Sequence, residues 1–174
     1  MVLVGAAGSG KSTLATRLFP VDWVLSSDAH RALVAGDEGD QAATKTAFSI
    51  LHRRLARRLA ARQSTVVDAT NVQPFARRSL VRRAVSHDVP VVAIVLALDR
   101  RLVLARNAMR TGRIVPADAV ERQLDELDRS LRRSSLVAEG FAAVHLLRTP
   151  EELDALAVDW AAREEPVRPP SPPR

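Results

Sequence analysis

Several residue types are missing or scarce in this 174-residue sequence, and each absence excludes a class of protein. The chain has no cysteine, so it has neither a disulfide framework nor a thiolate metal site. It has no tyrosine and only 3% aromatic residues, so the stacking platform common in single-strand binders is not visible. No apolar run approaches the roughly 20 residues that span a bilayer, and no signal-like segment opens the chain. We therefore expect a cytoplasmic protein without a membrane partner.

Lysine is scarce as well: of the 26 basic residues, only Lys11 and Lys45 are lysines. The net charge of +6 is compatible with a nucleic-acid partner. An alanine- and arginine-rich composition produces the same charge, however, so charge alone does not indicate a function.

The length and the 47% hydrophobic content indicate one globular domain, which we place at residues 1–165. Residues 166–174 hold five prolines and no apolar periodicity, so we expect this tail to be disordered. Between these limits, five short apolar runs have the character of strands buried on both faces of a parallel sheet. They are Val2–Gly5, Trp23–Ser27, Thr65–Ala69, Val89–Leu98 and Ala143–Leu147.

Helical patterns alternate with these runs. Gln41–Arg62 has an apolar stripe and an arginine-rich outer face, which we interpret as solvated in preference to a nucleic-acid groove. The spacing of Leu124, Leu127 and Leu131 predicts a second long helix, and a last one is expected over Glu151–Ala162. The order predicts an α/β fold of the P-loop NTPase and kinase type, a five-stranded parallel sheet flanked by helices.

Residues Gly5–Ser12 form a complete phosphate-binding loop, G-x-x-x-x-G-K-[ST], between a predicted strand and a predicted helix. Backbone N–H groups and the helix N-terminus would face the phosphates of an NTP. Lys11 would reach the β- and γ-phosphates and Ser12 would bind Mg²⁺. An ordinary glycine-rich turn is the alternative. The expected NTP-binding residues here are Gly8, Ser9, Gly10, Lys11, Ser12 and Thr13.

Two acidic residues follow predicted strands. Asp28 is a candidate general base for phosphoryl transfer to an alcohol, and Arg31 shares its helix face and could hold an anionic part of the acceptor. A helix cap with a surface arginine explains the same pair equally well. Asp68 is a candidate Mg²⁺ ligand, directly or through water, with a structural hydrogen bond as the alternative.

A third cluster is arginine-rich. Arg106 and Arg110 are one helical turn apart, and Arg113 follows a glycine. Such a trio is expected in a lid that closes on a triphosphate and stabilises the transferring phosphoryl group. Composition alone favours three solvated arginines. Phe48, Phe75 and Trp23 are expected in the core.

In order and spacing, these motifs resemble the kinase module of bacterial RNA-repair polynucleotide kinase-phosphatases over about residues 1–160. The motifs that carry the resemblance are Gly5–Thr13, Leu25–Asp28 with Arg31, Asp37–Gln41, Val66–Asn71 and the arginine lid. The resemblance implies transfer of the γ-phosphate of ATP or another NTP, with Mg²⁺, to the 5′-hydroxyl of RNA or DNA.

By this resemblance Asp28 is the general base and Arg31 contacts the phosphate on the 3′ side of the acceptor nucleoside. Gln41 falls at a substrate-site glutamine, and Arg106, Arg110 and Arg113 fall on the lid arginines. Larger members of that family add phosphatase and end-joining modules that this sequence lacks, so downstream repair modules are possible partners.

Two other functions remain open. Small-molecule kinases of the gluconate, shikimate or toxin type share the loop, the carboxylate and the lid. An NTP-hydrolysing switch is disfavoured because the chain has no Asn-Lys-x-Asp signature, and Ala69 stands where a catalytic glutamate would follow Asp68.

Overall fold

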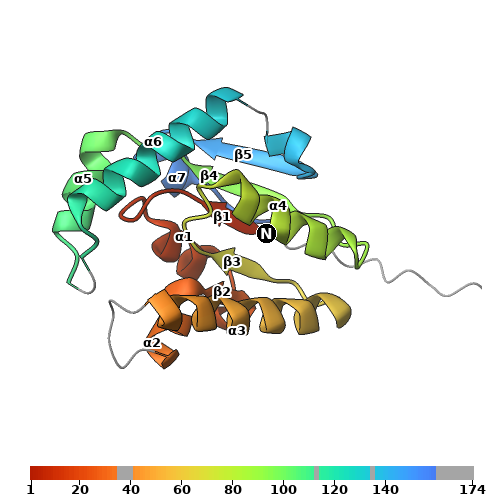
Figure 1. The fold of residues 1–174 in the computed structure, drawn as a ribbon. Helices are drawn as coiled ribbons and strands as arrows, with labels where there is room; N and C mark the ends of the chain where they lie inside the picture. The colour runs from red at the N-terminus through yellow and green to blue at the C-terminus, as the bar shows by residue number, and fades with distance from the viewer. Residues whose placement is uncertain (35–40, 112–113, 134–135, 160–174) are drawn as a thin grey trace, which may run out of the picture.

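The computed structural model describes residues 1–34, 41–111, 114–133 and 136–159. Five parallel strands form one sheet in the order β2-β3-β1-β4-β5 (Figure 1). The strands are β1 (Val2–Val4), β2 (Val24–Ser26), β3 (Val66–Asp68), β4 (Val92–Leu96) and β5 (Ala143–Leu147). Because all five strands are parallel, their carboxyl ends lie at one edge of the sheet, where such sheets bind ligands.

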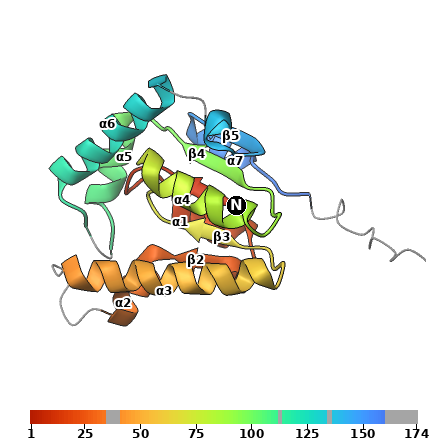
Figure 2. The same ribbon diagram turned by 45° about the vertical axis from the view of Figure 1, so that its right-hand side comes forward.

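Helices connect the strands on both sides of the sheet (Figure 2). They are α1 (Lys11–Leu18), α2 (Ser27–Val34), α3 (Gln41–Ala60), α4 (Pro74–Val85), α5 (Arg100–Ala108), α6 (Ala117–Arg133) and α7 (Pro150–Ala155), with 3₁₀ turns η1 (Val21–Trp23) and η2 (Leu136–Glu139). Within the described residues, none of these helices is both long and apolar enough to cross a membrane.

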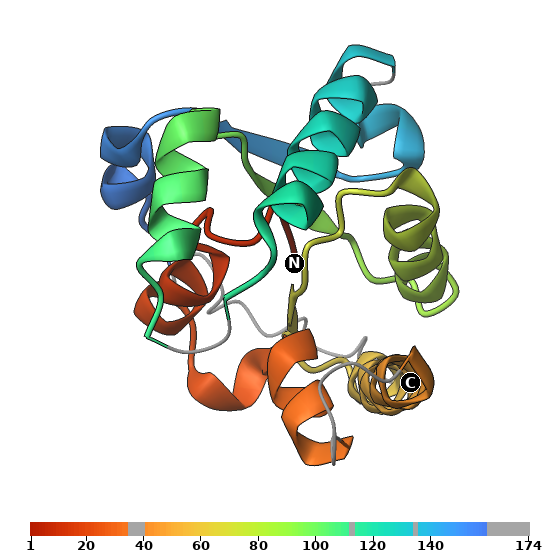
Figure 3. The same ribbon diagram turned by 60° about the vertical axis from the view of Figure 1, so that its left-hand side comes forward.

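Alternation along the strands sends apolar side chains to both faces. Val2 and Val4 pack with α3, α4 and α6, whereas Leu3 between them packs with α1 and α7. Figure 3 shows these two helical layers on opposite sides of the sheet. A third apolar cluster joins α5 and α6 beyond the carboxyl ends of the strands, next to Ala6 and Ala7. The glycine-rich segment after β1 is therefore held between the sheet and the α5–α6 pair.

A buried ion pair fixes the loop after β3. Arg77 of α4 is fully buried and donates to the carbonyl oxygens of Asn71 and Val72 at 2.9 and 2.7 Å. Its guanidinium also donates to both carboxylate oxygens of Glu139, at 2.8 and 2.6 Å, and contacts Ser130 of α6. These bonds satisfy a buried charge and tie three elements behind the functional edge of the sheet.

The predicted α/β fold and its five parallel strands are confirmed, with some boundaries changed. The predicted second strand is shorter, because Ser27 begins α2 and the Ser26 hydroxyl accepts the N–H of Ala29 at 3.3 Å. The predicted last helix ends at Ala155, because Leu156 and Val158 pack in an extended chain against the core of α1 and α7. The expected tail, residues 166–174, lies outside the described residues.

The expectation that three aromatic residues lie in the core is wrong for Phe75, whose side chain is 65% exposed at the start of α4. Phe48 and Trp23 are half-buried. The buried phenylalanines are Phe19 and Phe141.

Candidate active site

The phosphate-binding loop has the backbone conformation that its glycines predict. Gly8 and Gly10 have positive φ angles of 85° and 96°. A Cβ atom on Gly8 would lie 2.6 Å from the carbonyl oxygen of Val103, so only glycine lets the loop approach α5 this closely. Gly10 is the N-cap of α1, so the first turn of that helix, with Lys11 and Ser12, opens directly from the loop.

Lys11 lies inside the loop that it follows. Its ammonium group donates to the carbonyl oxygen of Ala6 at 2.8 Å and lies 3.4 Å from the Ser9 hydroxyl. Burial lowers the pKa of Lys11 from 10.5 to about 8, against the opposing charge of Asp68, and the nearby Arg110 lowers it further. A cation held out of water in this way interacts strongly with any anion that enters the loop.

Ser12 and Asp68 form the second polar contact of the site. The Ser12 hydroxyl donates to Oδ2 of Asp68 at 2.7 Å, and Asp68 is buried at the carboxyl end of β3. One hydroxyl and one carboxylate suit Mg²⁺, which keeps several waters and takes its other ligands from phosphates. No group of three histidine, cysteine, aspartate or glutamate side chains positioned to bind a metal occurs in the described residues.

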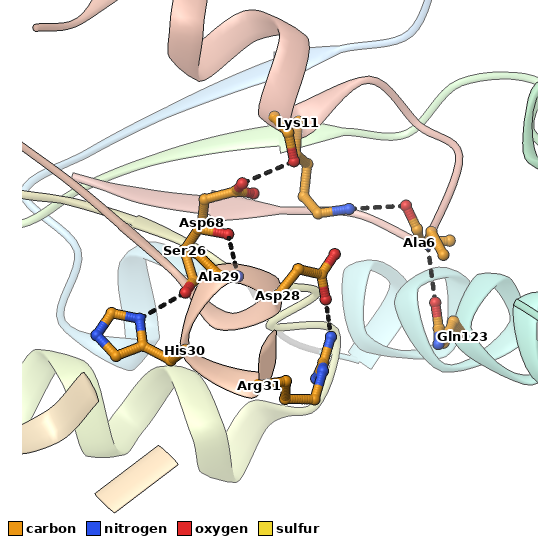
Figure 4. A network of polar contacts seen from close by, with 11 residues as sticks. Ala6, Lys11, Ser26, Asp28, Ala29, His30, Arg31, Asp68 and Gln123 are labelled. Atoms are coloured by element: carbon orange, nitrogen blue, oxygen red, sulfur yellow. Dashed lines mark hydrogen bonds and ion pairs between the residues drawn. The ribbon is translucent and has the colours of Figure 1, made fainter. Parts of the chain in front are cut away.

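Asp28 in the first turn of α2 and Arg31, three residues later in its last turn, form an ion pair (Figure 4). His30 fixes the turn before them, since its Nδ1 lies 2.6 Å from the carbonyl oxygen of Ser26. A carbonyl only accepts, so Nδ1 carries the proton, and Nε2 can accept from Arg54 of α3 at 3.5 Å. His30 thus links the end of β2 to α3 and supports the segment that carries Asp28.

One cavity of about 580 Å³ brings most of these side chains together. Its volume is in the range of ordinary small-molecule sites. The predicted site residues that line it are Gly8, Gly10, Lys11, Ser12, Thr13, Asp28, Arg31, Asp68, Arg106 and Arg110. Ser9 is buried beneath the loop. Gln41 begins α3, and its side chain is outside the described part of the structure, as is Arg113 altogether.

Arg106 and Arg110 reach the cavity from α5 and the segment after it. The Arg106 guanidinium lies 3.9 Å from the position that a Cβ atom on Gly10 would occupy. The segment after Arg110 is tied back to α5, because the buried Asn107 donates to the carbonyl oxygen of Val115 at 2.7 Å and accepts its N–H at 3.3 Å. This pair of bonds holds the arginines above the loop.

Sequence reasoning missed two residues that line this cavity. Gln123 of α6 accepts the backbone N–H of Ala7 at 2.8 Å, so a helix more than 100 residues away fixes the loop (Figure 4). Phe48 of α3 lines the same cavity as Asp28. Nothing in the sequence marks Gln123, because its role depends on the packing of α6 over the loop. A second cavity of similar volume lies at the amino ends of the strands and is lined mainly by aliphatic side chains.

Comparison with known proteins identifies the family. The AAA_33 family, described as an AAA domain, matches residues 1–134, which is most of the chain. The chain belongs to this AAA-domain family. Comparison with curated proteins gave no match.

Several solved structures share the fold. A chain in a structure of the Pnkp1/Rnl/Hen1 RNA repair complex aligns with a TM-score of 0.68 and 21% identity, over 77% of this chain and 45% of that one. A sugar kinase from Janibacter sp. HTCC2649 aligns with a TM-score of 0.56 and 22% identity, over 87% of each chain. A putative kinase from Chloroflexus aurantiacus aligns with a TM-score of 0.57 and 20% identity, over 88% of this chain and 91% of that one. The AAA_33 chain thus has a P-loop kinase-like fold and spans less than half of the repair-complex chain.

Proposed function

We propose that this protein is a polynucleotide 5′-hydroxyl kinase, which transfers the γ-phosphate of ATP or another NTP to the 5′ end of RNA or DNA. The observation that carries the proposal is the Asp28–Arg31 ion pair on the wall of the cavity that also contains Lys11 and Ser12. A carboxylate and a guanidinium side by side suit an acceptor that has a hydroxyl and a nearby anionic group. A nucleic-acid 5′ end has both.

The donor side of the site is assigned to the loop and its neighbours. Backbone N–H groups of Gly8, Ser9, Gly10 and Thr13 are assigned to the phosphates. The Ser9 N–H and the Lys11 ammonium group both donate to the Ala6 carbonyl oxygen, at 3.2 and 2.8 Å, and would exchange these bonds for phosphate oxygens, Lys11 for those of the β- and γ-phosphates. Ser12 and Asp68 would hold Mg²⁺, which would neutralise charge on the phosphate oxygens.

The acceptor side is assigned to α2. Asp28 takes the proton of the 5′-hydroxyl as its oxygen attacks the γ-phosphorus, and the bond from that phosphorus to the β-phosphate oxygen breaks to release the NDP. Arg31 moves from Asp28 to the phosphate on the 3′ side of the acceptor nucleoside, which frees the carboxylate. Gln41 is assigned to the same substrate.

The arginine lid is assigned to charge stabilisation. Arg106 and Arg110 lie above the loop and would place guanidinium groups against the transferring phosphoryl, with Arg113 assigned to the NTP. Residues 1–165 form the kinase unit in this proposal, and repair modules on other chains or segments are candidate partners.

Fold similarity supports a kinase but does not identify the acceptor of the phosphoryl group. One similar chain comes from an RNA repair complex, but a sugar kinase has the same fold, so a small-molecule acceptor is the alternative. A hydrolytic switch has less support, since Ala69 follows Asp68.

The test uses Asp28→Asn, which keeps the shape of the side chain and removes the base. We expect its rate of phosphate transfer to a 5′-hydroxyl RNA oligonucleotide to fall about 10²-fold or more, since general-base catalysis contributes this much. The affinity for ATP should change little, because Asp28 acts on the acceptor. Asp22→Asn, an exposed carboxylate just before β2, is the matched control and should keep wild-type rates. If Asp28→Asn lost ATP affinity together with the rate of phosphate transfer, the assignment of Asp28 as the general base would be rejected.

A further inference from the structure

The charges of the protein are distributed unevenly over its helices. α3 has five basic residues and no acidic residue, and α4 has four basic residues and no acidic residue. α6 comes from the same arginine-rich chain but has four basic and five acidic residues. α1 and α5 also lack acidic residues, but they have only two and three basic residues. α3 and α4 together have nine basic residues and no acidic residue, so positive charge is concentrated on this pair of helices.

Four arginines on these two helices define what we call the basic face, and all four are exposed. They are Arg53 and Arg57 on α3, and Arg78 and Arg82 on α4. Each pair has a spacing of four, so its members share one helix face, opposite the buried leucines of the core.

The basic face lacks the ion pairs found elsewhere on the surface. On the α5–α6 side, Arg100, Arg122 and Arg129 pair with aspartate or glutamate. Within the ranges that the structure describes, none of the four arginines of the basic face pairs with a carboxylate. Clustered like charges destabilise a folded protein unless an anion compensates them, so this surface is suited to a polyanion.

The basic face begins at the candidate active site. α3 and α4 lie side by side and run in the same direction (Figures 1 and 2), and both contribute to one apolar cluster. Phe48 of α3 lines the cavity, and one turn further its ring meets His52 edge-on with centroids 6.3 Å apart. His52 Nδ1 in turn lies 3.5 Å from the guanidinium of Arg83 on α4. A path of aromatic and cationic groups therefore leads from the cavity along α3 to α4.

Exposed aromatic rings support the same conclusion. Proteins that bind single strands combine cationic tracks with rings on which bases stack. Aromatic residues are scarce in this chain, yet Phe48 opens onto the cavity and Phe75 is 65% exposed in the first turn of α4. An apolar ring exposed beside arginines is expected where a base covers it.

We propose that the basic face binds the sugar-phosphate backbone of the acceptor strand downstream of its 5′ end, with Phe48 and Phe75 as stacking surfaces. This inference rests on the proposed kinase function. It specifies a single-stranded polynucleotide of several nucleotides as the substrate class, in place of a mononucleotide or a sugar. On α3, Phe48 and Arg57 are nine residues apart, which corresponds to about 14 Å along the helix.

The physical signature of such a track is salt dependence. Each phosphate neutralised on a single strand contributes about −0.7 to the slope of log affinity against log salt, so four contacts give a slope near −3. A slope of about −3 corresponds to a roughly 50-fold loss of affinity when salt rises fourfold. A mononucleotide acceptor would show little of this dependence.

The experiment measures fluorescence anisotropy of a labelled 5′-hydroxyl 12-nucleotide RNA over a series of salt concentrations. The test variant is R53Q/R57Q/R78Q/R82Q, and the matched control is R101Q/R122Q/R129Q/R132Q, which removes the same charge from exposed positions on α5 and α6. ATP affinity and circular dichroism report that both variants are folded. We expect log affinity to fall with log salt with a slope near −3 for the wild-type protein and the control. For the test variant we expect a slope that is less negative by about 3.

Equal slopes in the test variant and the control would overturn the proposal, because binding would then depend on overall charge. Equal competition by vesicles of phosphatidylglycerol would also overturn it, in favour of an anionic membrane surface. A transfer assay on the same RNA separates this proposal from the proposed function. Selective loss of binding without any transfer would refute the kinase assignment alone, and transfer with unchanged binding in the test variant would refute the basic face alone.

Discussion

The buried ammonium group of Lys11 predicts that ATP affinity depends on pH in a narrow window. Burial lowers the pKa of Lys11 to about 8 in the free protein. Bound phosphates stabilise the charged form, so the pKa in the complex must be higher than in the free protein. Binding ATP above pH 8 therefore requires the uptake of a proton, and affinity must fall as the pH rises.

The magnitude follows from this pKa. With a pKa of about 8, roughly nine-tenths of the lysine is charged at pH 7 and roughly one-tenth at pH 9. If the complex keeps its proton throughout, the affinity for MgATP falls about tenfold between these pH values. A lysine with its ordinary pKa of 10.5 would give almost no change in this range.

Isothermal titration calorimetry in two buffers of different ionisation enthalpy measures both the affinity and the number of protons taken up. We expect uptake to rise from near zero at pH 7 to nearly one proton at pH 9. Lys11→Arg is the control, because a guanidinium keeps its charge over this range and should remove the proton uptake. Flat affinity and no proton uptake up to pH 9 in the wild-type protein would refute the argument.

Two predictions concern stability and are measured by urea denaturation. Gly8→Ala should reduce the free energy of unfolding by about 1–3 kcal/mol more than Gly10→Ala. Both glycines have positive φ angles, but only at Gly8 would the new Cβ overlap α5. Equal losses in the two variants would show that the close approach of the loop to α5 is unimportant. Arg77→Met should cost about 3–5 kcal/mol, because it leaves the buried carboxylate of Glu139 unpaired, and Arg77→Met with Glu139→Leu should recover part of that loss. A cost of less than about 1 kcal/mol for the single change would contradict a closed, dry environment for this pair.

Much of the fold could be predicted because the signals for it are local. Short apolar strands and a glycine-rich loop determine a parallel sheet with its ligand edge at the strand ends. The exact ends of elements depend on contacts that sequence does not reveal. α7 stops at Ala155, where Leu156 turns to an extended conformation, and Leu156 and Val158 then pack against the apolar cluster of α1 and α7.

The same division holds for the candidate site. The sequence predicts that Lys11, Ser12, Asp28 and Asp68 lie together, because each follows a strand and parallel strands end at one edge, and all four line one cavity. Their roles stay predictions. Gln123 was not predictable, because the bond to the Ala7 N–H exists only once α6 has packed across the loop.

The aromatic residues show a related limit. Sequence reasoning assigned Phe75 to the core as an apolar residue, but the first turn of α4 presents it to solvent. Exposure of this kind is a property of the packed structure, and it places Phe75 on the same helix as Arg78 and Arg82 of the basic face.

The central claim is that the acceptor is a nucleic-acid 5′-hydroxyl, and the most direct test is to offer competing acceptors in one reaction. Labelled γ-phosphate of ATP would be supplied with Mg²⁺ to equal concentrations of a 5′-hydroxyl RNA, the matching DNA and gluconate, with a reaction lacking acceptor beside it. The account predicts label on the 5′ ends of the oligonucleotides and little free phosphate. Label on gluconate alone, or free phosphate released equally without an acceptor, would contradict it.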